Sequence, residues 1–188
     1  MQALRQFISR PALCYSSLFP QRFLQTSSVL EMPIKVGDPL PSVELMNCDP
    51  SNKVDISSYT GKIVIFGVPG AFTPTCSKDH APGFVNSVDA LKAKGVEKVV
   101  CVAVNDPFVM GAWRDHLDKN NQIEFLADIS AEFTKAIGLD FDASPILGNV
   151  RCKRFTMVVE NGKVKALNVE PDGTGLTCSR AKDVLKMV

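Results

Sequence analysis

Cys76 stands where a strand is expected to give way to a helix, which is a position suited to a reactive thiol. The β-branched and aromatic run 63–68 predicts a buried strand, and Gly and Pro residues punctuate the loop that follows. A helix is expected to begin at Cys76, where unpaired backbone N–H groups and positive partial charge would stabilise a thiolate over a thiol. The alternative is that Cys76 is inert, because a free cysteine is more often a small apolar residue packed in the core. If Cys76 is considered without the residues around it, that alternative is favoured.

His80 follows Cys76 by four residues, so on a helix the two side chains would share one face. A cysteine beside a histidine is the nucleophile and base of thiol proteases and transferases. The sequence therefore admits a Cys76–His80 hydrolase or acyl transferase as one class of function.

An α/β domain must position these residues. Strands are predicted over 43–46, 53–56, 63–68, 98–104, 122–127, 151–160 and 163–169. Helices are predicted over 76–94, 107–120, 131–137 and 180–187, and Pro82 with Gly83 should kink or split the first of them. Asp106 and Ser130 are the expected N-caps of the second and third helices, and Asn161-Gly162 is the expected hairpin turn. Strands joined by helices should run parallel and the last two antiparallel, which predicts a central mixed sheet flanked by helices.

The composition excludes several classes of function. A chain of 188 residues, 45% hydrophobic, fits one globular domain, and a net charge of +1 gives no case for nucleic acid or an anionic surface as a partner. Apolar runs stay below the roughly 18 residues that a membrane span needs. The six cysteines include no close pair, which argues against a zinc ribbon and against a Cys-x-x-Cys dithiol.

The segment 1–31 differs from the rest of the chain. Its charges before Glu31 are all arginines, and it is rich in Ser with a loose apolar stripe, which is typical of a mitochondrial presequence. Cys14 would then be absent from the mature protein, which would comprise the domain 32–188. Met32 offers an internal start that would give an untargeted cytoplasmic form. The chain ends in Lys186-Met187-Val188, unlike the Ser-Lys-Leu peroxisomal address.

Several motifs occur in an order that resembles a known family. The spacing Pro-x-x-x-Thr-x-x-Cys, formed by Pro69, Thr73 and Cys76, resembles the active-site signature of the peroxiredoxins. The longer string 66–77 is similar to the peroxiredoxin-5 branch in particular. Further matching stretches are 100–106, 153–159 and 166–179, and the likeness runs from about residue 33 to residue 179. The resemblance implies the thioredoxin fold, with 33–56 and the insert around 143–148 as additions.

The resemblance makes Cys76 a nucleophile that attacks a hydroperoxide and becomes a sulfenic acid. It assigns the neighbouring cation to Arg154, which only the fold can bring near; taken alone, Arg154 reads as a surface charge on a strand. The Thr73 hydroxyl can reach the sulfur or a peroxide oxygen if the loop folds back. Pro69 would shape the loop, and the backbone N–H groups of Thr75 and Cys76 would complete an anion site. The family often has glycine where this chain has Thr75.

In the peroxiredoxin-5 branch a cysteine at the position of Cys178 resolves the sulfenic acid as an intramolecular disulfide. Cys178 lies in a glycine-bearing loop that is suited to movement, although it could also be an inert residue at a helix start. Of the other cysteines, Cys101 is predicted to be core packing, Cys48 to be incidental and exposed, and Cys152 to be exposed without a role.

The expected function is that of an atypical two-cysteine thiol peroxidase, recycled by an external dithiol such as thioredoxin and needing no metal, haem or flavin. Its substrates would be hydrogen peroxide, alkyl hydroperoxides and, by family, peroxynitrite. The family implies a monomer or weak homodimer, and peroxisomal residence, known in the family, is doubtful here. Besides the hydrolase or acyl transferase, the remaining alternative is a redox-sensing binding module whose disulfide alters a partner surface without enzymatic turnover.

Overall fold

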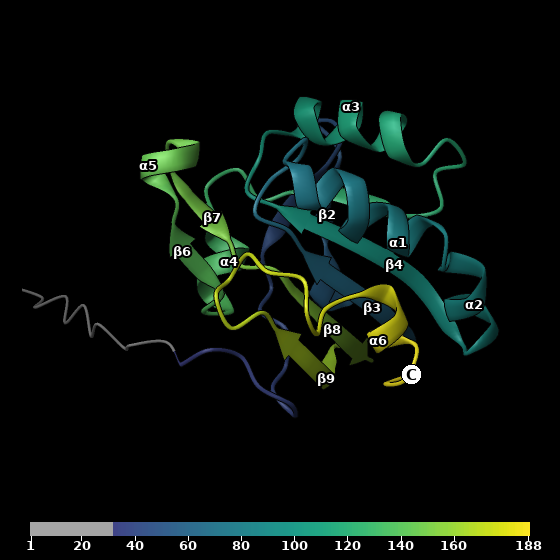
Figure 1. Ribbon diagram of the computed structural model, residues 1–188. Coiled ribbons are helices and arrows are strands. Elements are labelled where there is room, and N and C mark those ends of the chain that lie inside the picture. The colour runs from purple at the N-terminus through teal and green to yellow at the C-terminus, as the bar shows by residue number, and fades with distance from the viewer. Residues whose placement is uncertain (1–31) are drawn as a thin grey trace, which may run out of the picture. The chain divides into compact units, whose positions relative to one another are not determined.

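The computed structural model describes residues 32–188, so the expected presequence and Cys14 lie outside the described residues. A central sheet has the strand order β2-β1-β5-β4-β3-β8-β9, and β6 and β7 form a separate small sheet (Figure 1). The central strands are β1 (Glu44–Asn47), β2 (Lys53–Asp55), β3 (Lys62–Gly67), β4 (Val96–Ala103), β5 (Glu124–Ala127), β8 (Phe155–Glu160) and β9 (Lys163–Val169). The helices are α1 (Ala81–Val85), α2 (Val88–Ala93), α3 (Pro107–Leu117), α4 (Glu132–Ala136), α5 (Ser144–Leu147) and α6 (Ala181–Val184).

The sheet is mixed, as predicted. Strands β3, β4 and β5 run parallel because helices connect them, whereas β8 pairs antiparallel with β3 and with β9. The tight turn at Asn161-Gly162 joins β8 to β9, and both of its residues have positive φ, at 50° and 73°. That geometry is what an Asn-Gly hairpin turn provides, so this local signal fixed the end of the sheet.

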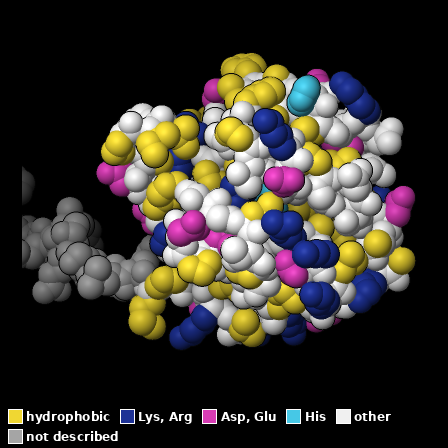
Figure 2. Space-filling view, viewed as in Figure 1, with side chains coloured by type: hydrophobic (Ala, Val, Ile, Leu, Met, Phe, Trp, Pro, Cys, Tyr) yellow, Lys and Arg dark blue, Asp and Glu magenta, His cyan; other side chains and the backbone are white. Residues whose placement is uncertain are grey.

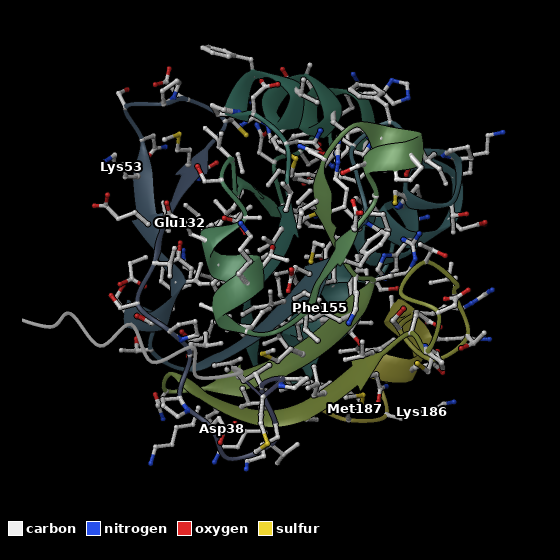
Figure 3. The ribbon with its side chains drawn as sticks, turned by 90° about the vertical axis from the view of Figure 1, so that its left-hand side faces the viewer. Asp38, Lys53, Glu132, Phe155, Lys186 and Met187 are labelled. Atoms are coloured by element: carbon white, nitrogen blue, oxygen red, sulfur yellow. The ribbon has the colours of Figure 1, made fainter. Side chains whose placement is uncertain are left out.

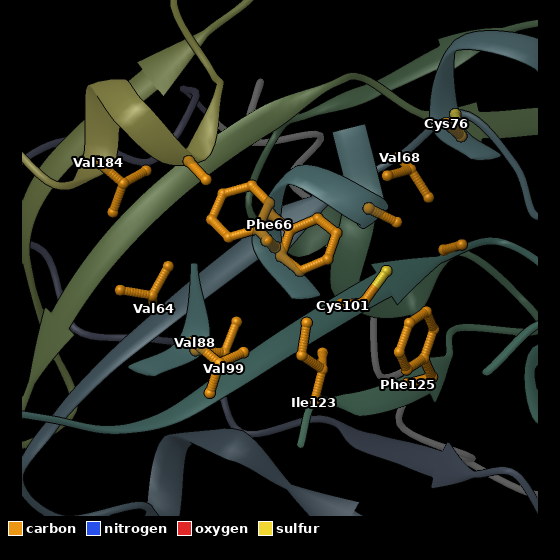
Figure 4. Close-up of a cluster of buried hydrophobic side chains, with 14 of the residues drawn as sticks. Val64, Phe66, Val68, Cys76, Val88, Val99, Cys101, Ile123, Phe125 and Val184 are labelled. Carbon is orange, nitrogen blue, oxygen red and sulfur yellow. The ribbon is translucent and has the colours of Figure 1, made fainter. Parts of the chain in front are cut away.

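Side chains that alternate along the central strands build two apolar layers. On one side Val64, Phe66, Val99 and Cys101 pack with residues of α1, α2, α3 and α6. Figure 4 shows Cys76 toward one end of this cluster. The other side packs against α4 and the segment 34–40, and Figure 3 shows α4, which begins at Glu132, in front of the sheet. The inner strands β3, β4, β5 and β8 therefore bury most of both faces, and the ends of the strands are left to form a site.

The helical stretch after Cys76 is divided, as Pro82 and Gly83 predict. A π-helix, Cys76–His80, leads into α1, and α1 ends before Asn86, so that α2 starts a separate helix. Pro82 follows the π-helix directly and lies at the start of α1, and the break in the helical run comes after Val85. The division lets the Cys76 end and the α2 end of this stretch pack against different parts of the sheet.

One predicted helix cap is confirmed and one is wrong. The Asp106 carboxylate accepts a hydrogen bond from the Val109 amide at 2.9 Å and caps α3. Ser130 does not cap α4. The residue before α4 is Ala131 at φ 56°, and this left-handed turn brings the carboxylate of Asp128 to the amides of Phe133 and Thr134. Asp128 therefore caps α4, although it lies three residues before the position at which an N-cap residue normally stands.

The single strand predicted over 151–160 is also wrong, because the chain changes sheets at Lys153 and Arg154. Strand β7 (Val150–Cys152) pairs with β6 (Asp140–Asp142), whereas β8 belongs to the central sheet. The Lys153 amide donates to the Leu139 carbonyl at 2.7 Å, and the Arg154 amide donates to the Gly173 carbonyl at 2.7 Å. The change of partners turns the Arg154 side chain away from the surface. Within residues 32–188, no helix is long and apolar enough to cross a bilayer.

Candidate active site

Cys76 is buried in the first helical turn after the loop that leaves β3. The helical run begins at Pro74, so the amides of Thr75 and Cys76 belong to the turn in which backbone N–H groups have no partner within the helix. Single π-turns occur frequently at functional sites, and here the π-turn starts at the cysteine itself. The predicted start of a helix at Cys76 is therefore correct to within two residues.

Hydrogen bonds fix the loop between β3 and Cys76. The Val68 amide continues the β3–β4 pairing by donating to the Val102 carbonyl at 3.1 Å, and the Ala71 amide donates to the Asn105 side-chain oxygen at 3.0 Å. The Thr73 hydroxyl donates to the Gly70 carbonyl at 2.9 Å, which stabilises the turn formed by residues 70–73. With its proton so engaged, the Thr73 oxygen keeps its lone pairs for a donor.

Arg154 is the cation beside the sulfur. Its side chain is only 2% exposed, and its Nη1 donates to Cys76 Sγ at 3.4 Å across 78 residues of sequence. Its Nε donates to the Thr174 carbonyl at 3.1 Å, which holds the plane of the guanidinium. The alternative of a surface charge on a strand is thus wrong. A buried, permanently charged donor at the sulfur is suited to a sulfur that reacts as an anion.

His80 supports Arg154 rather than Cys76. Its Nδ1 lies 3.1 Å from Arg154 Nη1, and its Nε2 lies 2.7 Å from the Ser179 carbonyl oxygen. Arginine can only donate and a carbonyl can only accept, so Nδ1 is the acceptor and Nε2 carries the hydrogen. Burial, reinforced by the charge of Arg154, lowers the pKa of His80 to about 3. Both ring nitrogens are engaged, so the geometry does not offer the base that a Cys–His hydrolase needs.

A cavity of about 320 Å³ opens over Arg154. The Cys76 loop lines it with Pro69, Thr73, Pro74 and Thr75. Ile146 and Leu147 of α5, together with Thr174, complete the lining. Ile146 is 87% exposed, and Figure 2 shows hydrophobic side chains over α5 on this face. The cavity therefore joins an apolar wall to a polar floor, which is the usual composition of a small-molecule site.

Arg151 anchors that apolar wall. Its guanidinium donates to the Val104 carbonyl at 3.0 Å, to the Leu147 carbonyl at 3.3 Å and to the Asn149 side chain at 2.6 Å. Nothing in the local pattern distinguishes Arg151 from a solvated surface charge. Only the fold shows that it ties α5 to the end of β4.

The sequence-predicted residues Pro69, Thr73, Thr75, Cys76 and Arg154 meet in this site, but Cys178 does not. Cys178 is half-buried, and its Sγ lies 3.6 Å from the Val169 carbonyl oxygen, whereas Cys76 Sγ contacts Arg154. All five cysteines within residues 32–188 are free thiols. The two sulfurs contact different groups, so a disulfide between Cys76 and Cys178 requires a rearrangement of the chain at one or both thiols.

The carboxylate of Glu170 holds that loop. Glu170 directly follows β9, is 1% exposed, and accepts hydrogen bonds from the amides of Thr177, Cys178 and Ser179. Burial opposes its ionisation, but the hydrogen bonds from Ser179 and Thr177 outweigh this and lower the pKa of Glu170 to about 2. Glu170 lies within the matching stretch 166–179, but no local pattern marks it as a functional residue.

The remaining described cysteines are packed. Cys101 is fully buried in the same layer as Cys76, as predicted. Cys152 is fully buried in the other layer, so its predicted exposure is wrong, and burial raises its pKa to about 12. Cys48 is half-buried with its Sγ 3.4 Å from the Phe125 carbonyl oxygen, not exposed in a turn. Among residues 32–188, no three His, Cys, Asp or Glu side chains are grouped so that they could hold a metal ion.

Comparison with known proteins identifies the family. The Redoxin family model matches residues 35–185. Peroxiredoxin-2C of Oryza sativa subsp. japonica is 45% identical over 159 residues, covering 82% of this chain and 98% of the relative. Peroxiredoxin 5 from Alvinella pompejana superposes with a TM-score of 0.73 at 38% identity, over 82% of this chain and 97% of that one. Reduced Prx3 from Vibrio vulnificus in complex with hydrogen peroxide superposes with a TM-score of 0.75 at 40% identity, over 81% and 98%.

These likenesses confirm the thioredoxin-like fold and the resemblance drawn from the motifs. They agree with a site in which a buried arginine faces a cysteine at the start of a helix. The chain belongs to the peroxiredoxins of the Redoxin family, in the peroxiredoxin-5 type, and is accordingly a thiol-dependent peroxidase.

Proposed function

We propose that this peroxidase is an atypical two-cysteine enzyme in which Cys76 attacks the peroxide and Cys178 resolves the product. The observation that carries the proposal is the 3.4 Å contact between Arg154 and Cys76 beside an open cavity. Arg154 stabilises the charge on the attacking sulfur and on the leaving oxygen. The Thr73 oxygen and the amides of Thr75 and Cys76 orient the peroxide, and Pro69 shields the sulfenic acid.

The proposed turnover has three steps. The Cys76 thiolate attacks the terminal peroxide oxygen, the O–O bond breaks, and Cys76 becomes a sulfenic acid. The departing alkoxide or hydroxide takes a proton from solvent and leaves as the alcohol or water, whereas peroxynitrite would release nitrite. The Cys178 thiol then displaces the hydroxyl group as water and forms the intramolecular disulfide. An external dithiol such as thioredoxin reduces the disulfide, so these steps need no metal, haem or flavin.

Hydrogen peroxide, alkyl hydroperoxides and peroxynitrite are the proposed substrates. The apolar wall formed by Ile146 and Leu147 supports the alkyl hydroperoxides, because a chain attached to the peroxide can lie against it. Comparison of kcat/KM for hydrogen peroxide with kcat/KM for tert-butyl hydroperoxide tests this range. We keep a monomer or weak homodimer as the proposed assembly, which sedimentation at several concentrations checks.

A peptide map under non-reducing conditions tests the cysteine assignment. The reduced protein receives one equivalent of hydrogen peroxide and is then alkylated and digested. A linked Cys76–Cys178 peptide is expected, with the buried Cys101 and Cys152 recovered as alkylated thiols. Sulfenic or sulfinic acid on Cys76 with Cys178 free would show a one-cysteine peroxidase, and an unmodified Cys76 would overturn the assignment of the nucleophile.

We propose that residues 1–31 address the protein to the mitochondrial matrix and that initiation at Met32 supplies a cytoplasmic form. The basic, acid-poor composition of the segment supports the address. Fusion of residues 1–31 to a fluorescent protein tests it, with the arginines replaced by glutamine as the control. An unchanged cytoplasmic pool after replacement of Met32 would contradict the internal start.

A further inference from the structure

The Glu170 carboxylate and the loop 177–179 form one hydrogen-bonded unit, here called the Glu170 clamp. Oε1 accepts from the amides of Thr177, Cys178 and Ser179 at 2.8, 2.9 and 2.9 Å, and from the Ser179 hydroxyl at 2.6 Å. Oε2 accepts from the Thr177 hydroxyl at 2.6 Å. Three consecutive amides centred on Cys178 thus donate to one buried carboxylate oxygen. Hydrogen bonds to a charged acceptor are stronger than those between neutral groups, so this single side chain holds the loop.

The closed clamp keeps Cys178 away from Cys76 and in its less reactive form. Cys178 Sγ faces the Val169 carbonyl, and burial together with the negative charge of Glu170 raises the pKa of the Cys178 thiol. A protonated thiol is a poor nucleophile toward a sulfenic acid. While the clamp is closed, Cys178 therefore neither reaches Cys76 nor carries the charge that the second step uses.

The closed clamp also completes the site around Cys76. Glu170 lies opposite Arg154 just beyond the β8–β9 ladder, and its amide donates to the Arg154 carbonyl at 3.0 Å. The Ser179 carbonyl, held in the clamp, accepts from His80, and His80 in turn accepts from Arg154. Attack on peroxide thus uses the closed loop, whereas formation of the disulfide uses the open loop.

We propose that Glu170 is a positioning residue for the second step, and that release of the loop 177–179 from its carboxylate limits the rate at which the disulfide forms. In that step the Cys76 S–O bond breaks and an S–S bond to Cys178 forms. The Cys178 proton leaves with the hydroxyl group as water, the Cys76 sulfur is reduced and the Cys178 sulfur is oxidised. The proposal rests on the proposed role of Cys178.

A consequence is that the Glu170 clamp sets how long the sulfenic acid persists. A second peroxide can oxidise a persisting sulfenic acid to a sulfinic acid, releasing an alcohol or water, in competition with Cys178. A tighter clamp would raise the share of Cys76 lost in this way, and a weaker clamp would lower it.

The test separates the two steps by rapid-mixing fluorescence. Trp113 is the single tryptophan, and its indole N–H donates to the hydroxyl of Ser77, next to Cys76, at 3.0 Å. It should report a first phase proportional to peroxide concentration and a second phase independent of it. Acid quenching and peptide mapping at matched times assign the two phases to the sulfenic acid and to the disulfide.

Glu170→Gln keeps the size of the side chain but removes the charge that strengthens these hydrogen bonds. We expect the second phase to accelerate about tenfold, with the first phase within about threefold of the wild type. Inactivation by excess peroxide should need correspondingly more peroxide. The matched control is Asp172→Asn, which alters an exposed carboxylate of the same loop that accepts from the amides of Thr174 and Gly175, and which should change neither phase.

An unchanged or slower second phase in Glu170→Gln would overturn the clamp while leaving the two-cysteine mechanism in place. If Glu170→Gln does not fold, Thr177→Val decides the matter in the same way, because it removes only the bond to Oε2 and should accelerate the second phase about threefold. If the wild type forms no Cys76–Cys178 disulfide, the proposed resolution fails first, and that outcome is visible without any variant.

Discussion

The two cysteines of the proposed reaction are held in opposite ways. Cys76 is fixed by the core: it lies in an apolar layer, starts a helix and touches a buried arginine. Cys178 is fixed by a single carboxylate, Glu170, through three amides and their flanking hydroxyl groups. The apolar packing around Cys76 can be lost only if that part of the core unfolds. The hydrogen bonds between Glu170 and the Cys178 loop can instead be replaced by hydrogen bonds to water.

This difference matches the demands of two successive reactions. A peroxide must meet a sulfur whose charge and direction are set in advance, because preorganised donors stabilise the transition state without rearrangement. A disulfide must instead bring together two sulfurs that begin apart. The core therefore holds Cys76 rigidly, whereas hydrogen bonds that can be broken hold the loop of Cys178.

The largest effect should come from exchanging each sulfur for oxygen. Cys76→Ser is expected to lower peroxide consumption by at least about 10³-fold, because a serine hydroxyl is not an effective nucleophile toward peroxide here. Cys178→Ser should leave the first turnover near the wild-type rate and abolish recycling by thioredoxin. A single-turnover assay alongside a steady-state assay distinguishes the two. If both variants lost activity equally in both assays, the two thiols would not have the separate attacking and resolving roles proposed here.

Removal of the cation tests the rigid side of the comparison. Arg154→Gln is expected to slow the first phase about 10²-fold, since one preorganised donor at the reacting atoms is lost. The matched control is Arg114→Gln, which removes a cation from the ion pair with Asp115 on α3. A first phase that persists in Arg154→Gln would show that the helix start alone activates the sulfur.

Alanine substitutions at two glycines compare how tightly the chain is packed near each thiol. Gly67 ends β3, just before the Cys76 loop, and Gly175 lies in the loop of Cys178. A Cβ on Gly67 would lie 2.2 Å from the Phe155 ring, so Gly67→Ala should lower the free energy of unfolding by about 2 kcal/mol. A Cβ on Gly175, in the loop of Cys178, would instead meet the exposed carboxylate of Asp172 at 2.9 Å, which can turn toward solvent, and should cost less than about 1 kcal/mol. Urea unfolding measures both, and similar costs would contradict the contrast in packing.

His80 joins the two regions, and its titration is expected to change stability by less than Gly67→Ala does. Its pKa in the folded protein is about 3, whereas an unperturbed histidine has a pKa of 6.5, so the unfolded chain takes up the proton first as pH falls. Stability from this group is complete above pH 6.5 and decreases toward pH 3, by about 1 kcal/mol between pH 7 and pH 5.5. Urea unfolding at both pH values should show this decrease in the wild type and in the exposed His116→Gln control, but not in His80→Gln.

Local signals in the sequence predicted local structure well. The hairpin at Asn161-Gly162 and the cap at Asp106 follow from chemistry within a few residues, and both are present. Ser130 failed as a cap because the left-handed Ala131 brings an earlier carboxylate to the helix. A prediction based on neighbouring residues cannot anticipate such a turn when no glycine marks it.

The site was predictable only where a motif supplied it. Cys76 and Thr73 share one loop, but Arg154 is 78 residues from Cys76 and reaches it because the chain changes sheets. Neither Arg151 nor Glu170 carries a local signal, since a lone charge in a sequence is more often solvated. Their roles arise from burial and from which carbonyls and amides converge on them, and these are properties of the folded chain.

Arg151 has a consequence for how this enzyme could diversify. It fastens the α5 wall of the cavity to the end of β4 through its own three acceptors, whereas the sulfur is served by Arg154. Substitutions at Ile146 can therefore reshape what fits against the wall while the reacting atoms keep their surroundings. During evolution, the range of peroxides that fit the cavity can therefore change without a change in the reactivity of the sulfur.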